Sequence, residues 1–217
     1  MLRKIYTQVL SPCLDIWTAK RFDTEGFYTI KPSEAIEPYE LWLPGRGGFQ
    51  RRRIRGELEP DVMDLLVERV NPGDTVFDVG AAWGYFSLAL TSLGATVYAF
   101  EIKEERIRSI EKSSQRSGLD VTTVAGAAGD TVRLDEYPVP DLIKMDIEGW
   151  EYQALLSGKE FLEQNRPVLV IEYHSPEAAL APDAVDKDTF YALLHDCGYE
   201  ITELDKRSVN NFHIIAE

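Results

Sequence analysis

The stretch Val76-Phe-Asp-Val-Gly-Ala-Ala-Trp-Gly84 decides the fold of this 217-residue chain. An apolar run surrounds Asp78, a turn of small residues follows, and a second apolar run, Val97-Tyr-Ala-Phe-Glu101, ends in a carboxylate. This order indicates a buried strand, a tight turn, a helix and a second buried strand, which form the first βαβ unit of a nucleotide-binding fold. We therefore expect an α/β domain built on a parallel sheet.

The chain beyond residue 58 keeps alternating between strand and helix patterns. Strands are expected at residues 75–79, 96–100, 121–125, 141–145, 167–173, 199–204 and 211–216, and helices at residues 60–70, 85–93, 104–117, 150–157 and 187–197. Such alternation predicts a doubly wound, mostly parallel, seven-stranded Rossmann-like sheet. The short connection between the last two strands predicts that they run antiparallel.

Residues 1–58 lack this alternation, and we assign them to an N-terminal extension of a domain at 59–217. Apolar side chains at helical spacing predict a helix at 1–10, which would pack on the domain, on a partner in a homodimer, or on a membrane surface. Residues 40–43 and 49–55 flank a turn and predict a β-hairpin. The extension would then serve as a lid, a dimer arm or a peripheral membrane contact.

The predicted strand at 49–55 carries the one basic stretch of an acidic chain. A strand would place Arg51, Arg53 and Arg55 on one face and Arg52 on the other. A solvated strand with acidic partners is the simpler interpretation. The alternative is an anion clamp for a uronate, a sugar phosphate or a lipid-linked glycan.

Composition argues against several classes of protein. The formal net charge of −14 argues against non-specific nucleic-acid binding. The two cysteines, Cys13 and Cys197, have neither the spacing of a metal motif nor that of a disulfide framework, which favours a reducing, cytoplasmic location. No apolar run reaches membrane-spanning length, and polar residues interrupt any signal-peptide core near the N-terminus.

The turn at the end of the first strand indicates which cofactor would bind. Its sequence is Gly80-x-Ala82-x-Gly84 rather than the Gly-x-Gly-x-x-Gly of dinucleotide sites. Asp78 lies two residues before the first glycine, where a carboxylate would repel a pyrophosphate but attract an ammonium or a sulfonium. S-adenosylmethionine (SAM) carries both cations. An NAD-dependent oxidoreductase is the alternative.

Cofactor-binding residues are expected at the carboxyl ends of the strands, where ligands of such sheets bind. The small residues of the turn would let the backbone approach the cofactor, and Glu101 is placed to accept both ribose hydroxyls. Small residues after the third strand would line the adenine. The expected cofactor-binding set is Asp78, Gly80, Ala81, Ala82, Trp83, Gly84, Glu101, Ile102, Ala127 and Asp146.

Acidic side chains follow the fourth strand in Lys144-Met-Asp-Ile-Glu-Gly-Trp-Glu151. Asp146 lies at the strand tip, and Glu148 opens the next helix. The fifth strand ends with His174, whose unperturbed pKa suits a general base. We expect Asp146, Glu148 and His174 to face the methyl acceptor. Acids at a helix N-terminus also stabilise the helix dipole, and a histidine at a strand end is often structural.

These segments resemble the FkbM-type family of SAM-dependent methyltransferases, in the family's order, over residues 60–217. The resemblance rests on Val76-Phe-Asp-Val-Gly-Ala-Ala-Trp-Gly-Tyr-Phe-Ser-Leu88, Val97-Tyr-Ala-Phe-Glu101, Ala127-Ala-Gly-Asp130, Asp141-Leu-Ile-Lys-Met-Asp-Ile-Glu-Gly-Trp-Glu151 and Val170-Ile-Glu-Tyr-His174. It implies a class I methyltransferase sheet in which Asp78 and Gly80 hold the methionine part of SAM and Glu101 holds the ribose. The family more often has Ala-Asn where this chain has Ala82-Trp83, so Trp83 would alter how the methionine end is held.

The hypothesis from sequence is therefore a SAM-dependent methyltransferase acting on a hydroxyl or carboxyl group of a sugar, glycan or other small metabolite, anionic and lipid-linked acceptors included. A hydroxyl acceptor needs a base, whereas a carboxylate needs only positioning. The hypothesis requires no metal, and Mg²⁺ held by the clustered acids is the alternative. A catalytically inactive SAM-fold binding subunit is the alternative outside enzymes.

Overall fold

The computed structural model describes residues 24–45, 48–204 and 210–217. The strands are β1 (Gly26–Ile30), β2 (Tyr39–Leu43), β3 (Thr75–Val79), β4 (Thr96–Glu101), β5 (Val121–Ala125), β6 (Leu142–Met145), β7 (Val168–His174), β8 (Ile201–Glu203) and β9 (Asn211–Ala216). The helices are α3 (Gly48–Ile54), α4 (Pro60–Arg69), α5 (Tyr85–Ser92), α6 (Glu104–Ser117), α7 (Glu151–Ser157), α8 (Lys159–Asn165) and α9 (Lys187–Asp196). The central sheet has the strand order β5-β4-β3-β6-β7-β9-β8, and β1 and β2 form a separate sheet.

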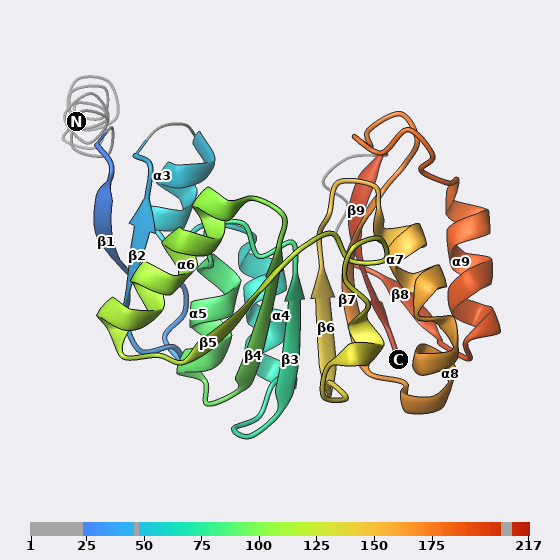
Figure 1. Ribbon diagram of the computed structural model, residues 1–217, viewed down its shortest axis with the longest axis horizontal. Coiled ribbons are helices and arrows are strands. Elements are labelled where there is room, and N and C mark those ends of the chain that lie inside the picture. Colours follow the sequence, from blue (N-terminus) through green and yellow to red (C-terminus); the bar gives the residue numbers. More distant parts are fainter. Residues whose placement is uncertain (1–23, 46–47, 205–209) are drawn as a thin grey trace, which may run out of the picture.

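Helices cover both faces of the central sheet, because alternate residues of each strand point to opposite sides. Val76 of β3 joins a core with α4, α5 and α6, whereas the next residue, Phe77, joins a second core with α7, α8 and α9. Both side chains are fully buried. In Figure 1, β1, β2 and α3 lie beside α6 at one end of the molecule, and α7, α8 and α9 gather at the other.

The strand order confirms the doubly wound, mostly parallel, Rossmann-like sheet. Strands β5, β4, β3, β6 and β7 are parallel neighbours. Strand β9 lies between β7 and β8 and is antiparallel to both, which confirms the prediction for the C-terminal pair. Helix α8 was not predicted, because it spans seven residues directly after Gly158 and buries Leu162 alone, too little for a periodic apolar pattern.

The N-terminal extension contains a β-hairpin, as predicted, and residues 40–43 form one of its strands, but the other strand is not the one predicted. Strand β2 pairs with β1, and residues 49–55, the predicted partner, lie mostly in α3. Glutamine and arginine are good helix formers, and the alternation in this short segment did not outweigh that preference. The predicted division of Arg51 and Arg53 from Arg52 across a strand is therefore wrong. The helix predicted at 1–10 lies outside the described residues.

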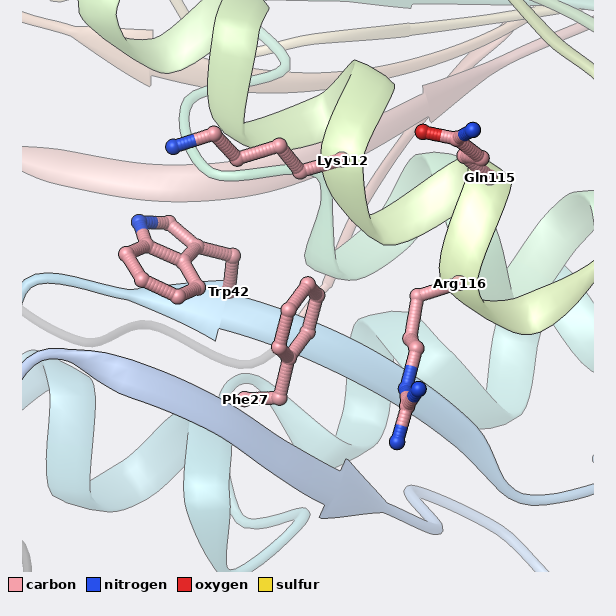
Figure 2. Close-up of a pocket in the computed structure, with 5 residues that line it drawn as sticks. All are labelled: Phe27, Trp42, Lys112, Gln115 and Arg116. Carbon is pink, nitrogen blue, oxygen red and sulfur yellow. The ribbon is translucent and has the colours of Figure 1, made fainter.

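The hairpin is attached to α6 by hydrogen bonds and by cations packed on aromatic rings. Ser109 Oγ donates to the Trp42 carbonyl at 2.6 Å. Figure 2 shows the outer side of this contact, a groove in which Lys112 Nζ lies 4.5 Å from the Trp42 ring centroid and the Arg116 guanidinium carbon lies 5.7 Å from that of Phe27. Such contacts are each worth about 0.5–1 kcal/mol at exposed sites, and together they hold the extension against α6.

Two further expectations concern a membrane and the cysteines. Across residues 24–45, 48–204 and 210–217, no helix combines the length and apolarity needed to cross a bilayer. Cys197, directly after α9, is a buried free thiol. Cys13 lies outside the described residues.

Candidate active site

The carboxyl ends of β3, β4, β6 and β7 meet along one edge of the sheet, and the loops that follow them form the candidate active site. The turn after β3 is tied to the end of β4, because the amides of Gly80 and Ala81 both donate to the Phe100 carbonyl at 3.0 Å. The loop after β5 joins them through the Gly126 amide, which donates to the Glu101 carbonyl at 3.1 Å. Three loops expected around the cofactor therefore lie side by side.

The glycines of the turn after β3 allow close contact between protein segments. Gly80 has a left-handed backbone (φ 86°), and a Cβ there would lie 1.9 Å from the Asp146 carbonyl oxygen. A Cβ at Gly84 would lie 2.9 Å from Leu88 Cδ1 and 3.0 Å from Ile110 Cγ1. Neighbouring protein atoms thus require small residues at positions 80 and 84, whether or not a cofactor is bound. Gly80 brings the turn into direct contact with the tip of β6.

Asp78 lies at the end of β3 and is fully buried. Its Oδ2 accepts a hydrogen bond from Ser87 Oγ at 2.5 Å, and its Oδ1 lies 3.6 Å from Lys144 Nζ. No hydrogen bond from the described residues reaches Oδ1, so this oxygen can accept one more donor, such as an ammonium. Asp78 therefore links the end of β3 to Ser87 in α5 and to Lys144 in β6. Its contact with the cofactor stays a prediction.

Glu101, at the end of β4, is 3% exposed and accepts hydrogen bonds on both carboxylate oxygens. Oε2 accepts from the Ala82 amide at 2.9 Å and from Arg106 at 3.2 Å. Oε1 accepts from the amides of Ile102 and Lys103, both at 2.9 Å. In addition to its predicted role at the ribose, Glu101 thus joins the turn after β3 to the start of α6.

The remaining predicted cofactor residues lie around Glu101. Ile102 follows it and is 66% exposed, which leaves an apolar surface that suits packing against adenine. Ala127 is half-buried in the loop after β5. Trp83 is half-buried, and the Arg106 guanidinium carbon lies 5.9 Å from its ring centroid. The Glu101 carboxylate and the exposed Ile102 side chain beside it are groups that suit the ribose and the adenine of an adenosine, respectively.

We expect Glu101→Gln to weaken the binding of S-adenosylhomocysteine by about 10- to 100-fold, because hydrogen bonds to a charged group are worth about 1.5–3 kcal/mol. The side-chain NH₂ of the new glutamine would also face backbone N–H groups that now donate to the Glu101 carboxylate. Calorimetric titration measures the loss, and Glu104→Gln, at an exposed position in α6, is the control. An unchanged dissociation constant in a folded Glu101→Gln protein would remove this residue from the cofactor site.

The loop after β6 carries two of the predicted acceptor-facing acids. Asp146 is half-buried, and its amide donates to the Val79 carbonyl at 3.0 Å. Among the described residues none donates a hydrogen bond to the Asp146 carboxylate, so that group is available to a ligand. Glu148 is 58% exposed and has a left-handed backbone (φ 59°), an unusual conformation that recurs at functional sites.

Glu151 and His174 organise this loop. Glu151 is 2% exposed, and its Oε1 accepts from two loop amides at 2.9 and 3.2 Å. The same oxygen lies 3.2 Å from His174 Nδ1, and Glu148 Oε2 lies 3.6 Å from His174 Nε2. The structure thus brings Asp146, Glu148 and His174 together and adds Glu151, which the sequence indicated only as a helix N-terminal acid.

The acids around His174 raise the pKa of its ring. Burial would lower the pKa of its ring, but the hydrogen bond and charge of Glu151, together with the charges of Asp146 and Glu172, raise this pKa to about 9. A protonated imidazole cannot accept a proton at neutral pH. This geometry therefore favours His174 as a positive charge that positions the acids, rather than as the general base that its unperturbed pKa suggested.

The stabilising contribution of His174 should disappear in alkaline solution. Because its folded-state pKa of about 9 exceeds the ordinary 6.5, the contribution is full below pH 6.5 and is lost as the pH rises through 9. We expect the free energy of unfolding to fall by on the order of 3 kcal/mol across this window, and by much less in His174→Gln. Denaturant unfolding at a series of pH values measures the slope. His195→Gln is the control, since His195 bonds a backbone carbonyl, and equal slopes in all three proteins would contradict a charged His174.

The sequence did not predict a second buried cluster, which consists of Glu59, Glu172 and His213. Glu172 Oε2 lies 3.7 Å from His213 Nε2, which is also 3.7 Å from Glu59 Oε2. Burial and the charge of Asp146 raise the pKa of Glu172. Glu172 and His174 are two residues apart in β7, so their side chains lie on the same face of the strand. Glu59, just before α4, is brought there only by the fold.

Two sets of these side chains are spaced closely enough to hold a metal ion: Asp146, Glu151 and His174, and Glu59, Glu172 and His213. Within each set, one possible ligand atom from each residue lies within 4.8 Å of the others. Carboxylates and imidazoles are common ligands of divalent metals. The prediction that no metal is required is therefore open to a direct test with a chelator.

Arg53, near the end of α3, belongs to the surroundings of this site. Its side chain is half-buried, and its guanidinium lies within electrostatic reach of Asp146 and Arg106. Burial and the charge of Arg106 lower the pKa of Arg53 to about 10, so the group stays charged at neutral pH. Gln50 Oε1 accepts a hydrogen bond from Arg53 Nη1 at 3.3 Å. The sequence indicated an anion clamp in this segment but could not choose among its arginines.

Comparisons with known sequences agree with this geometry. The family described as Methyltransferase FkbM domain matches residues 85–201. A Haloferax volcanii protein named hexuronic acid methyltransferase AglP is 27% identical over 190 residues, which cover 71% of this chain and 75% of that protein. A Pyrococcus abyssi protein named 23S rRNA (uracil(747)-C(5))-methyltransferase is 29% identical over 131 residues, which cover 57% of this chain and 32% of that protein.

Solved methyltransferase structures with bound SAM share the fold. The magnesium protoporphyrin IX methyltransferase of Synechocystis PCC 6803 has a TM-score of 0.60 and 17% identity, with 99% of this chain and 94% of that chain covered. Fibrillarin of Aeropyrum pernix has a TM-score of 0.52 and 14% identity, with 69% and 68% covered. At these identities the likeness shows the fold, which is that of SAM-binding methyltransferases.

Proposed function

This chain belongs to the FkbM methyltransferase family and is a SAM-dependent methyltransferase, and from that premise we propose that it methylates an oxygen atom of a sugar or glycan. The observation that carries the proposal is the position of Asp146, whose carboxylate accepts no hydrogen bond from the described residues while its backbone touches the cofactor turn at Gly80. A group able to accept a proton thus lies beside the cofactor loops. The family assignment replaces the NAD-dependent oxidoreductase that the turn alone left open.

A sugar acceptor is supported by the Haloferax volcanii protein, which is named a hexuronic acid methyltransferase and of which this chain covers 75%. A hexuronic acid offers hydroxyl groups and a carboxylate as methyl acceptors. We therefore propose an acidic sugar, free or within a lipid-linked glycan, as the acceptor. The net charge of −14 makes the RNA acceptor of the Pyrococcus abyssi protein the weaker choice.

SAM supplies an activated methyl group when it is bound. We propose that Glu101, Ile102 and Ala127 hold its adenosine part, and that the turn at 80–84, with Asp78 and Asp146, holds the methionine end. A hydroxyl acceptor must lose a proton during methylation, and Asp146 is the proposed acceptor of that proton. His174 and Glu148 would help to position Asp146 and the acceptor. A carboxylate acceptor releases no proton, so the protein would only align it.

The proposal is tested with purified protein, SAM carrying a labelled methyl group, and glucuronate, a glucuronate-bearing oligosaccharide, glucose and an rRNA fragment as acceptors. We expect label on the acidic sugars. Mild base then releases the label as methanol from a carboxyl ester but leaves it on an ether. A parallel reaction with a chelator shows whether a metal is needed. Binding of S-adenosylhomocysteine without transfer to any sugar, or transfer to RNA alone, would overturn the proposal and favour the binding subunit or an RNA enzyme.

We also propose that residues 59–217 form the methyltransferase domain and that the described part of the extension, residues 24–45 and 48–58, borders its active site through α3. A cytoplasmic location and a homodimer remain part of this proposal. Measuring the molar mass in solution, with and without residues 1–23, tests the dimer.

A further inference from the structure

We propose that Arg53 binds a carboxylate in the active site, so that this chain selects a ligand with a carboxylate beside the reacting groups. The proposal rests on the proposed function, because it names the chemistry that the same site would recognise. Two molecules at that site can supply the carboxylate: an acidic acceptor and the methionine end of the cofactor.

The hydrogen bonding of Arg53 is incomplete. Its Nε is buried and has no hydrogen-bond partner among the described residues, and the same holds for the Nε of Arg106. Within the part of the chain that the structure describes, Gln50 supplies the one acceptor of the Arg53 guanidinium, at 3.3 Å. A guanidinium has five N–H donors in a planar fork, so a single amide oxygen leaves most of them for another acceptor.

The charges around Arg53 are unbalanced. Arg106 is already paired with Glu101 at 3.2 Å and repels Arg53, whereas Asp146 attracts Arg53 without forming an ion pair. No carboxylate of the described residues lies within 4.0 Å of the Arg53 nitrogens, although acids outnumber bases 37 to 23 in the chain. A buried charge without a partner is costly. An added anion would offset both the missing hydrogen bonds and the repulsion between the arginines.

An anion bound by Arg53 would lie toward the reacting end of the site. Arg53 is within electrostatic reach of Asp146 at the tip of β6 and of Tyr85 at the start of α5, directly after the cofactor turn. Bidentate pairing with a guanidinium favours a carboxylate held in one orientation. Arg53 is thus a binding residue that would orient a carboxylate beside Asp146, and the neighbouring Arg52 is exposed.

The test compares the wild type with Arg53→Gln, Arg53→Lys and the exposed control Arg52→Gln. Calorimetry gives dissociation constants for S-adenosylhomocysteine and for 5′-methylthioadenosine, which lacks the amino-acid carboxylate. With S-adenosylhomocysteine present, it also gives those for glucuronate and glucose. We expect Arg53→Gln to weaken at least one carboxylate-bearing probe by about 10- to 100-fold, Arg53→Lys to restore part of the loss, and Arg52→Gln to match the wild type.

The pattern of losses identifies the source of the carboxylate. A loss for glucuronate alone assigns the acceptor, and a loss for S-adenosylhomocysteine but not for 5′-methylthioadenosine assigns the cofactor. Equal losses for every probe, or no loss for any, would overturn the proposal, the first because it indicates a structural role. The comparison of S-adenosylhomocysteine with 5′-methylthioadenosine does not depend on the acceptor, so it still tests Arg53 if the methyl-transfer assay shows that the proposed acceptor class is wrong.

Discussion

Replacing Asp146 with asparagine should lower kcat by about 10²- to 10⁴-fold with a sugar hydroxyl as acceptor, the usual contribution of general base catalysis. The variant keeps the size of the side chain and the backbone bond to Val79, but it loses the negative charge and the proton acceptor. The free energy of unfolding should stay within about 1 kcal/mol of the wild type, because no described residue hydrogen-bonds this carboxylate.

Asp141→Asn is the matched control for Asp146→Asn. Asp141 precedes β6 at the opposite end of the same strand, where its Oδ2 accepts a hydrogen bond from the Thr75 amide at 2.8 Å. This variant should lose about 1 kcal/mol of stability and keep its kcat. Single-turnover kinetics and denaturant unfolding of both variants separate the two effects. A normal kcat in Asp146→Asn with a hydroxyl acceptor would contradict the role of Asp146 as the base. An equal loss of kcat in both variants would show that a disturbance of β6, rather than the missing base, causes it.

Gly80→Ala should destabilise the fold by at least about 3 kcal/mol and abolish cofactor binding. An L-residue at φ 86° costs about 1–2 kcal/mol, and the added Cβ would lie 1.9 Å from the Asp146 carbonyl oxygen, which belongs to backbone. Either the turn or the tip of β6 must move, and both carry predicted cofactor residues. A chain of this length should lose about 6–12 °C in Tm for 3 kcal/mol.

Gly73→Ala separates backbone strain from the steric clash. Gly73 also has a left-handed backbone (φ 95°), but apart from its chain neighbours no atom of the described residues lies within 4 Å of a Cβ placed there. It should therefore lose only the cost of the backbone conformation, about 1–2 kcal/mol, and bind S-adenosylhomocysteine normally. Thermal unfolding and calorimetric titration give both quantities. Equal stability losses in the two variants would show that the contact between Gly80 and Asp146 does not constrain the site.

Much of the central sheet could be read from the sequence because its signals are local. The run from Val76 to Val79, the small-residue turn and the acid at Glu101 each depend on neighbours in the chain, and strands covered on both faces show as continuous apolar runs. The order of these signals also predicted which strand ends carry polar groups. It follows that Asp146, Glu148 and His174 could be placed at one edge before their contacts were known.

The sequence by itself thus determined the α/β fold, the candidate cofactor loops and the acidic strand ends. The reason is that apolar side chains recur every two residues in a strand and every 3.6 residues in a helix, and this spacing is visible in the sequence. Only the tertiary structure decided that Arg53 of α3 lies within electrostatic reach of Asp146, that Glu59 meets Glu172 across His213, and that neighbouring acids raise the pKa of His174. These features depend on burial and on charges from segments far apart in sequence. A pKa or an ion pair is set by all groups within a few ångströms, which no local pattern records.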